Sequence, residues 1–271
     1  MSYDEHYIGS VTALGDTHQV VASQAVLARN GMQLIERGGR VDSSLREKLQ
    51  QHKLVPAIDQ CLTVAGSVTQ ASLRDRAREI LDGEPRFQLL RSALPSLDQL
   101  LNAFYAMPLA PALAFKLTVA REPRPEIYEH SLQMTLIALF LAIKSRLPDR
   151  DLAAVAAAGM LHDIGELHID PELLRPGRRL EAADLRHVYA HPMTAYLILQ
   201  EYPPYHPEIS SAVFEHHERL DGSGYPRGLT GEQMTLSGRI LSVANAFVAL
   251  VSARAYRQGM SMDDALAELL R

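Results

Sequence analysis

The paired histidines in the segment from His191 to Pro226, with the glycine-rich turn behind them, constrain this chain most. The centre of the segment reads His216-His217-Glu218-Arg219-Leu220-Asp221-Gly222-Ser223-Gly224-Tyr225-Pro226. Neutral imidazole is the commonest metal ligand in proteins, and glycine permits a close approach of the backbone to a ligand. A plain surface loop would need the glycines and the proline but not the two imidazoles. The turn is therefore predicted to be a metal or catalytic site, with a satisfied structural histidine pair as the alternative.

The composition excludes several other classes of protein. The chain of 271 residues is long enough for one large domain and a small one. Its formal net charge of −5 gives no reason to expect a nucleic-acid polymer or a membrane surface as a partner. The single cysteine, Cys61, excludes an intramolecular disulfide and fits a reducing compartment. Because the apolar stretches are short and residues 1–10 hold none, we expect no signal peptide or membrane span, and predict a cytoplasmic protein.

The second half of the chain carries apolar residues at helical spacing. This spacing predicts helices over residues 126–144, 151–161, 181–191, 193–199, 209–217, 237–253 and 262–270. Eight of the eleven histidines also lie in this half, from His130 onward. The sequence therefore predicts a mainly α fold in which the polar chemistry is concentrated in the helical C-terminal part.

The N-terminal part has a different character. Residues 11–41 alternate short β-favouring runs with turn signals, and Asn30-Gly31 predicts the turn of a small β-hairpin. Asp42 and the two serines after it predict the cap of a short helix, and residues 54–117 are typical of helices interrupted by prolines. We predict a small α+β module with a helical linker over residues 1–115, followed by a helical metal-binding domain over residues 116–271.

Two polar pairs in the helical half are candidate metal ligands. Glu126 and His130 are four residues apart and share one face of a helix, which also fits an ordinary hydrogen bond between them. His162 and Asp163 directly follow a buried helix, where polar groups are costly unless they are satisfied. A metal would satisfy both, since the imidazole gives one bond and the carboxylate can bridge two ions. A hydrogen-bonded core pair is the alternative.

His187 and His191 are also four residues apart. We predict that His191, next to Pro192, is the site residue and that His187 faces solvent. Asn245 stands as a lone polar residue in an otherwise apolar helix.

The ordered set of motifs resembles the HD-GYP family, a branch of the HD-domain metal-dependent phosphohydrolases. The resemblance covers about residues 120–270 and rests on several separated motifs that occur in the right order. It implies an HD-type helical bundle with the metals in its middle. It also implies a phosphodiesterase that opens cyclic di-GMP to give pGpG and often GMP, with two or three iron or manganese ions.

The resemblance further implies a role for individual residues. The implied metal ligands are Glu126, His130, His162, Asp163, His191, His216, His217 and Asn245. Among them, Asp163 would bridge two ions, and Glu126 with His130 would hold an additional one. His162 and Asp163 would form the catalytic centre. The implied substrate-binding residues are Glu166, Asp221, Gly224, Tyr225, Pro226, Arg254 and Arg257.

Two positions depart from the family pattern. The family usually has lysine where this chain has Glu166, and an aspartate ligand where it has Asn245. Glu166 should repel a diester unless it is neutralised, and Asn245 offers an oxygen without a charge. These changes leave three readings: a phosphodiesterase, a degenerate module that binds the nucleotide or a protein partner without hydrolysis, and a phosphohydrolase for another nucleotide. The intact Gly224-Tyr225-Pro226 motif favours the first reading over the third. A diguanylate cyclase or another signalling protein is a further expected partner.

Overall fold

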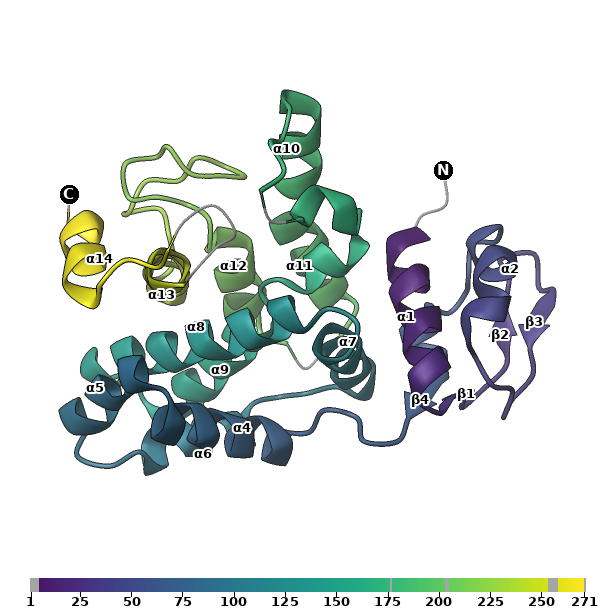
Figure 1. The fold of residues 1–271 in the computed structure, drawn as a ribbon, viewed down its shortest axis with the longest axis horizontal. Helices are drawn as coiled ribbons and strands as arrows, with labels where there is room; N and C mark the ends of the chain where they lie inside the picture. The colour runs from purple at the N-terminus through teal and green to yellow at the C-terminus, as the bar shows by residue number, and fades with distance from the viewer. Residues whose placement is uncertain (1–4, 176, 203–204, 253–257, 271) are drawn as a thin grey trace.

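A computed structural model describes residues 5–175, 177–202, 205–252 and 258–270 of the chain. These residues are mostly helical, which confirms the predicted mainly α class. Figure 1 shows a small N-terminal module at one end of the molecule, beside a larger bundle of helices that ends in α14. We use the name N-terminal module for residues 5–64.

The N-terminal module combines short helices with two small antiparallel sheets. Its elements are α1 (Glu5–Thr17), β1 (Val20–Ala22), β2 (Val26–Leu27), β3 (Gln33–Ile35), η1 (Ser43–Leu45), α2 (Arg46–Gln50), α3 (Ile58–Cys61) and β4 (Leu62–Val64). The pairing of β2 with β3 confirms the predicted hairpin around Asn30-Gly31. Asp42 caps η1 by accepting a hydrogen bond from the Ser44 N–H at 3.0 Å, as its sequence position predicts.

The prediction of β-favouring runs from residue 11 is wrong for residues 11–17, which belong to α1. The side chains of Val11 and Leu14 on this helix are buried in the core. Gly15 lets α1 pack closely on the following chain, since a Cβ there would lie 1.8 Å from the Val41 carbonyl oxygen. Packing against distant residues has therefore decided the conformation of this segment.

The helical bundle is built around one long buried helix, α8. Its elements are α4 (Gln70–Gly83), α5 (Pro85–Ala93), α6 (Asp98–Ala106), α7 (Pro111–Arg121), α8 (Pro125–Lys144), α9 (Asp149–Leu161), η2 (Ile164–His168), η3 (Pro171–Leu174), α10 (Ala182–Val188), α11 (His191–Gln200), α12 (Pro207–Glu215), α13 (Leu236–Val251) and α14 (Met262–Leu269). Helix α8 packs against α7, α9 and α13. A Cβ on Gly159 of α9 would lie 2.5 Å from Thr135 Oγ1 of α8, so the glycine lets these two helices approach closely.

A buried polar network joins the N-terminal module to the bundle. Lys116 of α7 lies with its Nζ 3.6 Å from Asp59 Oδ2 and 3.4 Å from His168 Nε2, and 3.7 Å from the centre of the Tyr7 ring. The Tyr7 ring stacks on His168 at 4.9 Å, and the Tyr202 hydroxyl donates to Asp59 Oδ2 at 3.1 Å. Since His168 is the last residue of η2, the module contacts the segment that directly follows His162 and Asp163.

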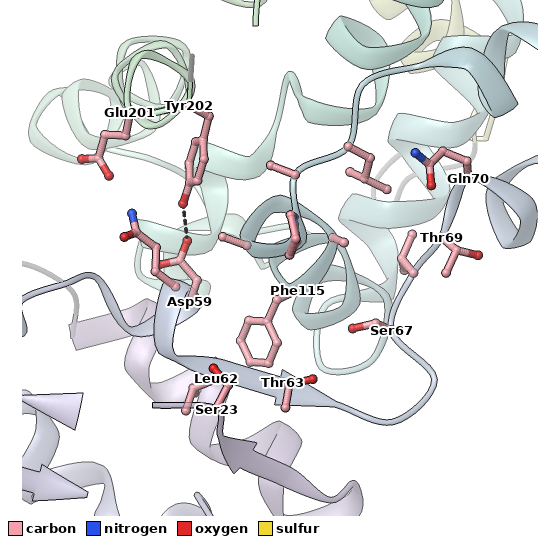
Figure 2. Close-up of a pocket in the computed structure, with 17 residues that line it drawn as sticks. Ser23, Asp59, Leu62, Thr63, Ser67, Thr69, Gln70, Phe115, Glu201 and Tyr202 are labelled. Atoms are coloured by element: carbon pink, nitrogen blue, oxygen red, sulfur yellow. Dashed lines mark hydrogen bonds between the residues drawn. The ribbon is translucent and has the colours of Figure 1, made fainter. Parts of the chain in front are cut away.

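An open cleft of about 770 Å³ lies along this junction. Figure 2 shows Asp59 and Tyr202 facing each other at one end, with Ser67 and Thr69 further along the wall. None of the histidines in the described residues lines the cleft. The predicted boundary after residue 115 falls inside α7, and the division into two domains stays a prediction.

No single helix within the described ranges is both long and apolar enough to cross a membrane. Helices α6 and α7 reach that length and apolarity only when taken together, and the chain bends by 117° between them.

Candidate metal centre

The candidate ligands come from the ends of different helices, which converge in the bundle. His162 and Asp163 directly follow α9, His191 opens α11, and His216 directly follows α12. These four side chains are buried, and His130 in the second turn of α8 is half-buried. The structure thus brings together residues that are far apart in the sequence.

Three of the histidines are oriented in the same way. Each donates from Nδ1 to the backbone carbonyl three residues earlier: His162 to Gly159 at 2.8 Å, His191 to Val188 at 2.7 Å, and His216 to Val213 at 2.6 Å. Because a carbonyl can only accept, Nδ1 must carry the proton, and Nε2 of the neutral ring keeps its lone pair. The ends of the helices therefore fix both the tautomer and the direction of the ring, as outer-shell partners do at metal sites.

The Asp163 carboxylate lies between these imidazoles. Its Oδ2 is 2.8 Å from His162 Nε2 and 3.8 Å from His130 Nε2. Its Oδ1 is 3.4 Å from His191 Nε2 and 3.5 Å from His216 Nε2. Each oxygen thus faces a different pair of histidines, which is the arrangement that a carboxylate needs to bridge two ions.

Two compact groups of donor atoms share Asp163. The groups are Asp163, His191, His216 and His217, and His130, His162 and Asp163, with the donor atoms of each group within 4.8 Å of one another. Two buried atoms, His162 Nε2 and Asp163 Oδ1, make no hydrogen bond despite these short distances. Buried polar atoms without partners are costly, and a cation between them would remove that cost. The residues present therefore fit a divalent metal centre.

Burial sets the protonation of this cluster. It lowers the pKa of His216 to about 4, although Asp163 opposes the shift. Burial, together with repulsion from His216, also holds the pKa of His217 well below its usual value. Burial alone would raise the pKa of Asp163, but attraction from His162 keeps it well below its ordinary value. At neutral pH the centre therefore offers the Asp163 carboxylate and the neutral imidazoles of His216 and His217, the forms that bind metal. The pKa of His191 moves the other way: burial lowers it, but the hydrogen bond with Asp163 and the charge of that carboxylate raise it above its usual value.

The glycine turn lies directly against the histidine pair. A Cβ on Gly224 would lie 2.4 Å from the Arg219 nitrogen and 2.5 Å from the His217 carbonyl oxygen, so only glycine fits. The next N–H, that of Tyr225, donates to this His217 carbonyl at 3.1 Å. The turn thereby places the Tyr225 ring over the His217 ring, stacked at 4.6 Å with 20° between their planes.

Two buried glutamates, which were not predicted from the sequence, hold the loop between the glycine turn and α13 in place. Glu218 accepts hydrogen bonds from the backbone N–H groups of Arg227 at 2.7 Å and Leu229 at 2.9 Å. Glu215 accepts from both the N–H and the hydroxyl of Thr235, each at 2.8 Å, at the start of α13. An acidic residue beside a glycine-rich turn was the available signal, because such carboxylates satisfy loop N–H groups.

Gly165 is a third residue whose role only the structure reveals. A Cβ there would lie 2.2 Å from the His191 carbonyl oxygen. The glycine therefore allows η2 to pack against the start of α11, where His191 lies.

Glu126 and Asp221 are not members of either donor group. The Glu126 side chain is 63% exposed and accepts a hydrogen bond from Arg124 Nε at 2.6 Å. Asp221 is exposed and accepts from the N–H and hydroxyl of Ser223, at 2.9 and 2.6 Å, within the turn. Their predicted roles in metal and substrate binding stay predictions.

Pro226 is exposed and directly follows Tyr225, and its role in substrate binding stays a prediction. His187 is exposed, which agrees with the prediction that it faces solvent. Arg254 and Arg257 lie outside the described residues.

The two positions that depart from the family pattern have distinct surroundings. Glu166 is half-buried, and its burial together with repulsion from Asp163 raises its pKa to about 7. Asn245 is buried in α13, with its Oδ1 2.9 Å from His130 Nε2. The Asn245 oxygen therefore lies beside the same His130 nitrogen that faces Asp163 Oδ2 at 3.8 Å.

Comparison with known proteins assigns the chain to a family. A model of the HD domain matches residues 117–271, more than half of the chain. The chain belongs to the HD-domain family. The match begins in α7 and includes every candidate ligand, and membership of this family implies divalent metal binding.

Three relatives agree with the family assignment. The chain is 36% identical over 138 residues to 3'3'-cGAMP-specific phosphodiesterase 3 of Vibrio cholerae, which covers 51% of this chain and 30% of that protein. It is 37% identical to a cyclic di-GMP phosphodiesterase response regulator of Xanthomonas campestris (51% of this chain, 36% of the relative). It is 33% identical to a cyclic di-GMP phosphodiesterase of Pseudomonas aeruginosa (52% and 34%). The matched segment spans about a third of each relative. The predicted resemblance to the HD-GYP branch is confirmed.

Proposed function

We propose that this chain is a metal-dependent phosphodiesterase that hydrolyses cyclic di-GMP to pGpG, GMP or both. One observation carries the proposal: two compact groups of donor atoms, most of them on buried side chains, share the Asp163 carboxylate. Centres with two cations catalyse in-line displacement at phosphorus by stabilising the attacking and leaving oxygens. The substrate class comes from the names of the relatives, two of which are cyclic di-GMP phosphodiesterases.

The donor groups indicate which residues would hold each ion. The proposed ligands are His191, His216 and His217 for one ion, His130 and His162 for the other, and Asp163 for both. Imidazole mixed with carboxylate oxygen suits iron or manganese better than a thiolate-type zinc site, so we infer iron or manganese. When bound, such cations polarise phosphoryl oxygens and lower the pKa of water. Glu126 would have to leave its pair with Arg124 to hold a third ion.

The side chains around the proposed ions would hold the ligands in the orientation and protonation state that metal binding needs. The hydrogen bonds from Nδ1 to the helix ends hold the imidazoles in one tautomer, so no reorientation is needed when substrate arrives. The low pKa of Asp163 keeps its carboxylate ionised at neutral pH. The turn at Gly224 brings the Tyr225 ring against the His217 ring, which helps to hold this imidazole in its orientation.

The test pairs metal analysis with turnover. The protein is purified without oxygen, its iron and manganese are quantified, and conversion of cyclic di-GMP to pGpG and GMP is followed. His191→Ala should lose metal and turnover, whereas His187→Ala, at an exposed histidine four residues away, should keep both. Wild-type protein that carries metal but leaves cyclic di-GMP intact would overturn the proposal, as would full activity in His191→Ala.

A receptor without hydrolysis is the second candidate. Asn245 contacts His130 where a charged ligand is expected, and Glu166 places a carboxyl group, with its pKa raised to about 7, where the family has a lysine. Binding of cyclic di-GMP without turnover would identify it. Asn245→Asp should then increase metal content and restore turnover.

Hydrolysis of another nucleotide is the third candidate function, because one relative is named as a 3'3'-cGAMP-specific phosphodiesterase. Parallel assays with cyclic di-GMP and 3'3'-cGAMP compare the two substrates directly. Faster turnover of 3'3'-cGAMP would replace cyclic di-GMP in the proposal. A diguanylate cyclase or another signalling protein as partner stays a prediction.

A further inference from the structure

We propose that Tyr189 positions the substrate by stacking one of its nucleobases at the entrance of the metal centre. This inference rests on the proposed function and adds a residue that neither the sequence motifs nor the family assignment singles out. It starts from a stack of three aromatic rings that begins at the candidate ligand His217.

The stack runs from His217 through Tyr225 to Tyr189. The His217 and Tyr225 ring centroids lie 4.6 Å apart, and those of Tyr225 and Tyr189 lie 4.1 Å apart, with 20° between the planes in each pair. Tyr189 stands at the end of α10, two residues before the ligand His191. The stack is therefore attached to the centre at both ends, through His217 on one side and through the His191 turn on the other.

The middle ring of the stack has both faces covered. His217 and Tyr189 each lie nearly parallel to Tyr225, and two rings on one face of Tyr225 would also have to contact each other. The described residues show no ring contact between His217 and Tyr189, so these rings cover opposite faces. A nucleobase consequently cannot stack on Tyr225 in this arrangement.

Tyr189 is the most exposed residue of the stack. It is 44% exposed, while His217 and Tyr225 are half-buried. A purine is a flat aromatic group, and stacking on a tyrosine requires no particular hydrogen-bond pattern on the base. A cyclic dinucleotide with its phosphate at the ligands would therefore find a base platform on Tyr189, separated from the ligand His217 by the Tyr225 ring.

The stack also has a structural role, since Tyr189 supports the ring of Tyr225. The two roles predict different results. Support of Tyr225 affects every ligand of the centre, whereas base stacking affects only ligands that carry a base.

The experiment compares two ligands of the metal-loaded full chain. Titration calorimetry measures the Kd of a phosphorothioate analogue of cyclic di-GMP, which resists hydrolysis, and the Kd of inorganic phosphate, which has no base. The variants are Tyr189→Ala, Tyr189→Phe and, as a matched control, Tyr105→Ala at an exposed tyrosine on α6.

Tyr189→Ala should weaken binding of the dinucleotide by about 5- to 150-fold, the usual range for loss of one stacked base, with phosphate binding and metal content unchanged. Tyr189→Phe, which keeps the ring, and Tyr105→Ala should resemble the wild type. Unchanged dinucleotide binding in Tyr189→Ala overturns the inference, and so does an equal loss of dinucleotide and phosphate binding. Wild-type protein that binds phosphate but not the dinucleotide instead overturns the proposed function.

Discussion

Replacement of Lys116 alone is the perturbation that most directly tests the junction between the N-terminal module and the bundle. The Lys116 and Asp59 side chains are only 4% and 3% exposed, and the ammonium also lies over the Tyr7 ring. Lys116→Met keeps most of the side-chain volume but leaves the Asp59 carboxylate buried without its cation. The carboxylate then has to be neutralised or hydrated inside the protein, which favours the unfolded state.

The size of the effect follows from this burial. Removal of one partner of a buried ion pair costs ~3–5 kcal/mol, whereas replacement of both partners by neutral groups is often nearly neutral. Asp59 keeps the hydrogen bond from the Tyr202 hydroxyl at 3.1 Å, so we expect the lower end, about 3 kcal/mol. Since about 1 kcal/mol moves Tm by ~2–4 °C in a large domain, Lys116→Met should melt roughly 6–12 °C below the wild type.

The assay is thermal and urea unfolding of the full chain, followed by circular dichroism. Lys116→Met combined with Asp59→Asn keeps an acceptor for Tyr202 and removes the unpaired charge, so it should recover most of the lost stability. Lys144→Met, at an exposed lysine on α8, is the matched control and should change stability by less than about 0.5 kcal/mol. A single variant as stable as the wild type, or a double variant no more stable than the single one, would refute the reasoning.

Four further outcomes are expected. Asp163→Asn should empty both donor groups while the helical content stays, because the amide carries no charge; mass spectrometry of bound metal and circular dichroism measure this. Gly224→Ala should lower turnover of cyclic di-GMP by about 100-fold, since its Cβ would lie 2.4 Å from the Arg219 nitrogen and displace the turn; Ser223→Ala, at an exposed neighbour, is the control. Chelation should lower Tm, because an ion at 100 times its Kd stabilises the folded state by ~2.7 kcal/mol, and unchanged melting would contradict metal binding. The metal-free protein should lose stability as the pH falls from 6.5 towards 4. Burial lowers the pKa of His216 to about 4 in the folded state, so between these pH values the unfolded chain binds a proton at His216 and the folded chain does not. The free energy of unfolding, measured by urea titration, should fall by on the order of 3 kcal/mol.

The sequence predicted the bundle better than the N-terminal module because its helices have regular buried faces. Helix α8 and the segment ending at His162 carry apolar residues at helical spacing, and their ends were located within a few residues. In α1, glycines and threonine interrupt the buried face, and the close contact of Gly15 with the Val41 carbonyl comes from a distant part of the chain. Helix and strand propensities of the local sequence cannot predict a contact with such a distant residue.

The candidate ligands were named from local motifs and a resemblance, whereas their convergence required the structure. Asn245 was expected to offer its oxygen to an ion, and the structure shows this oxygen 2.9 Å from His130 Nε2. The role of Glu218 was not predicted, because its partners are backbone N–H groups of the turn and the spacing of side chains gives no information about them. The stacking of Tyr189 on Tyr225 likewise joins two segments that no periodicity connects.

The contact between Tyr7 and His168 has a consequence for how such a protein can change over time. His168 ends the short segment that begins directly after Asp163, and Asp59 supplies the charge opposite Lys116 inside the bundle. Replacement of the N-terminal module by an unrelated one would remove Tyr7 and Asp59 together. The Lys116 ammonium would then lose the carboxylate that it faces. A different module in this place would therefore need its own carboxylate opposite Lys116, or a neutral residue in place of that lysine.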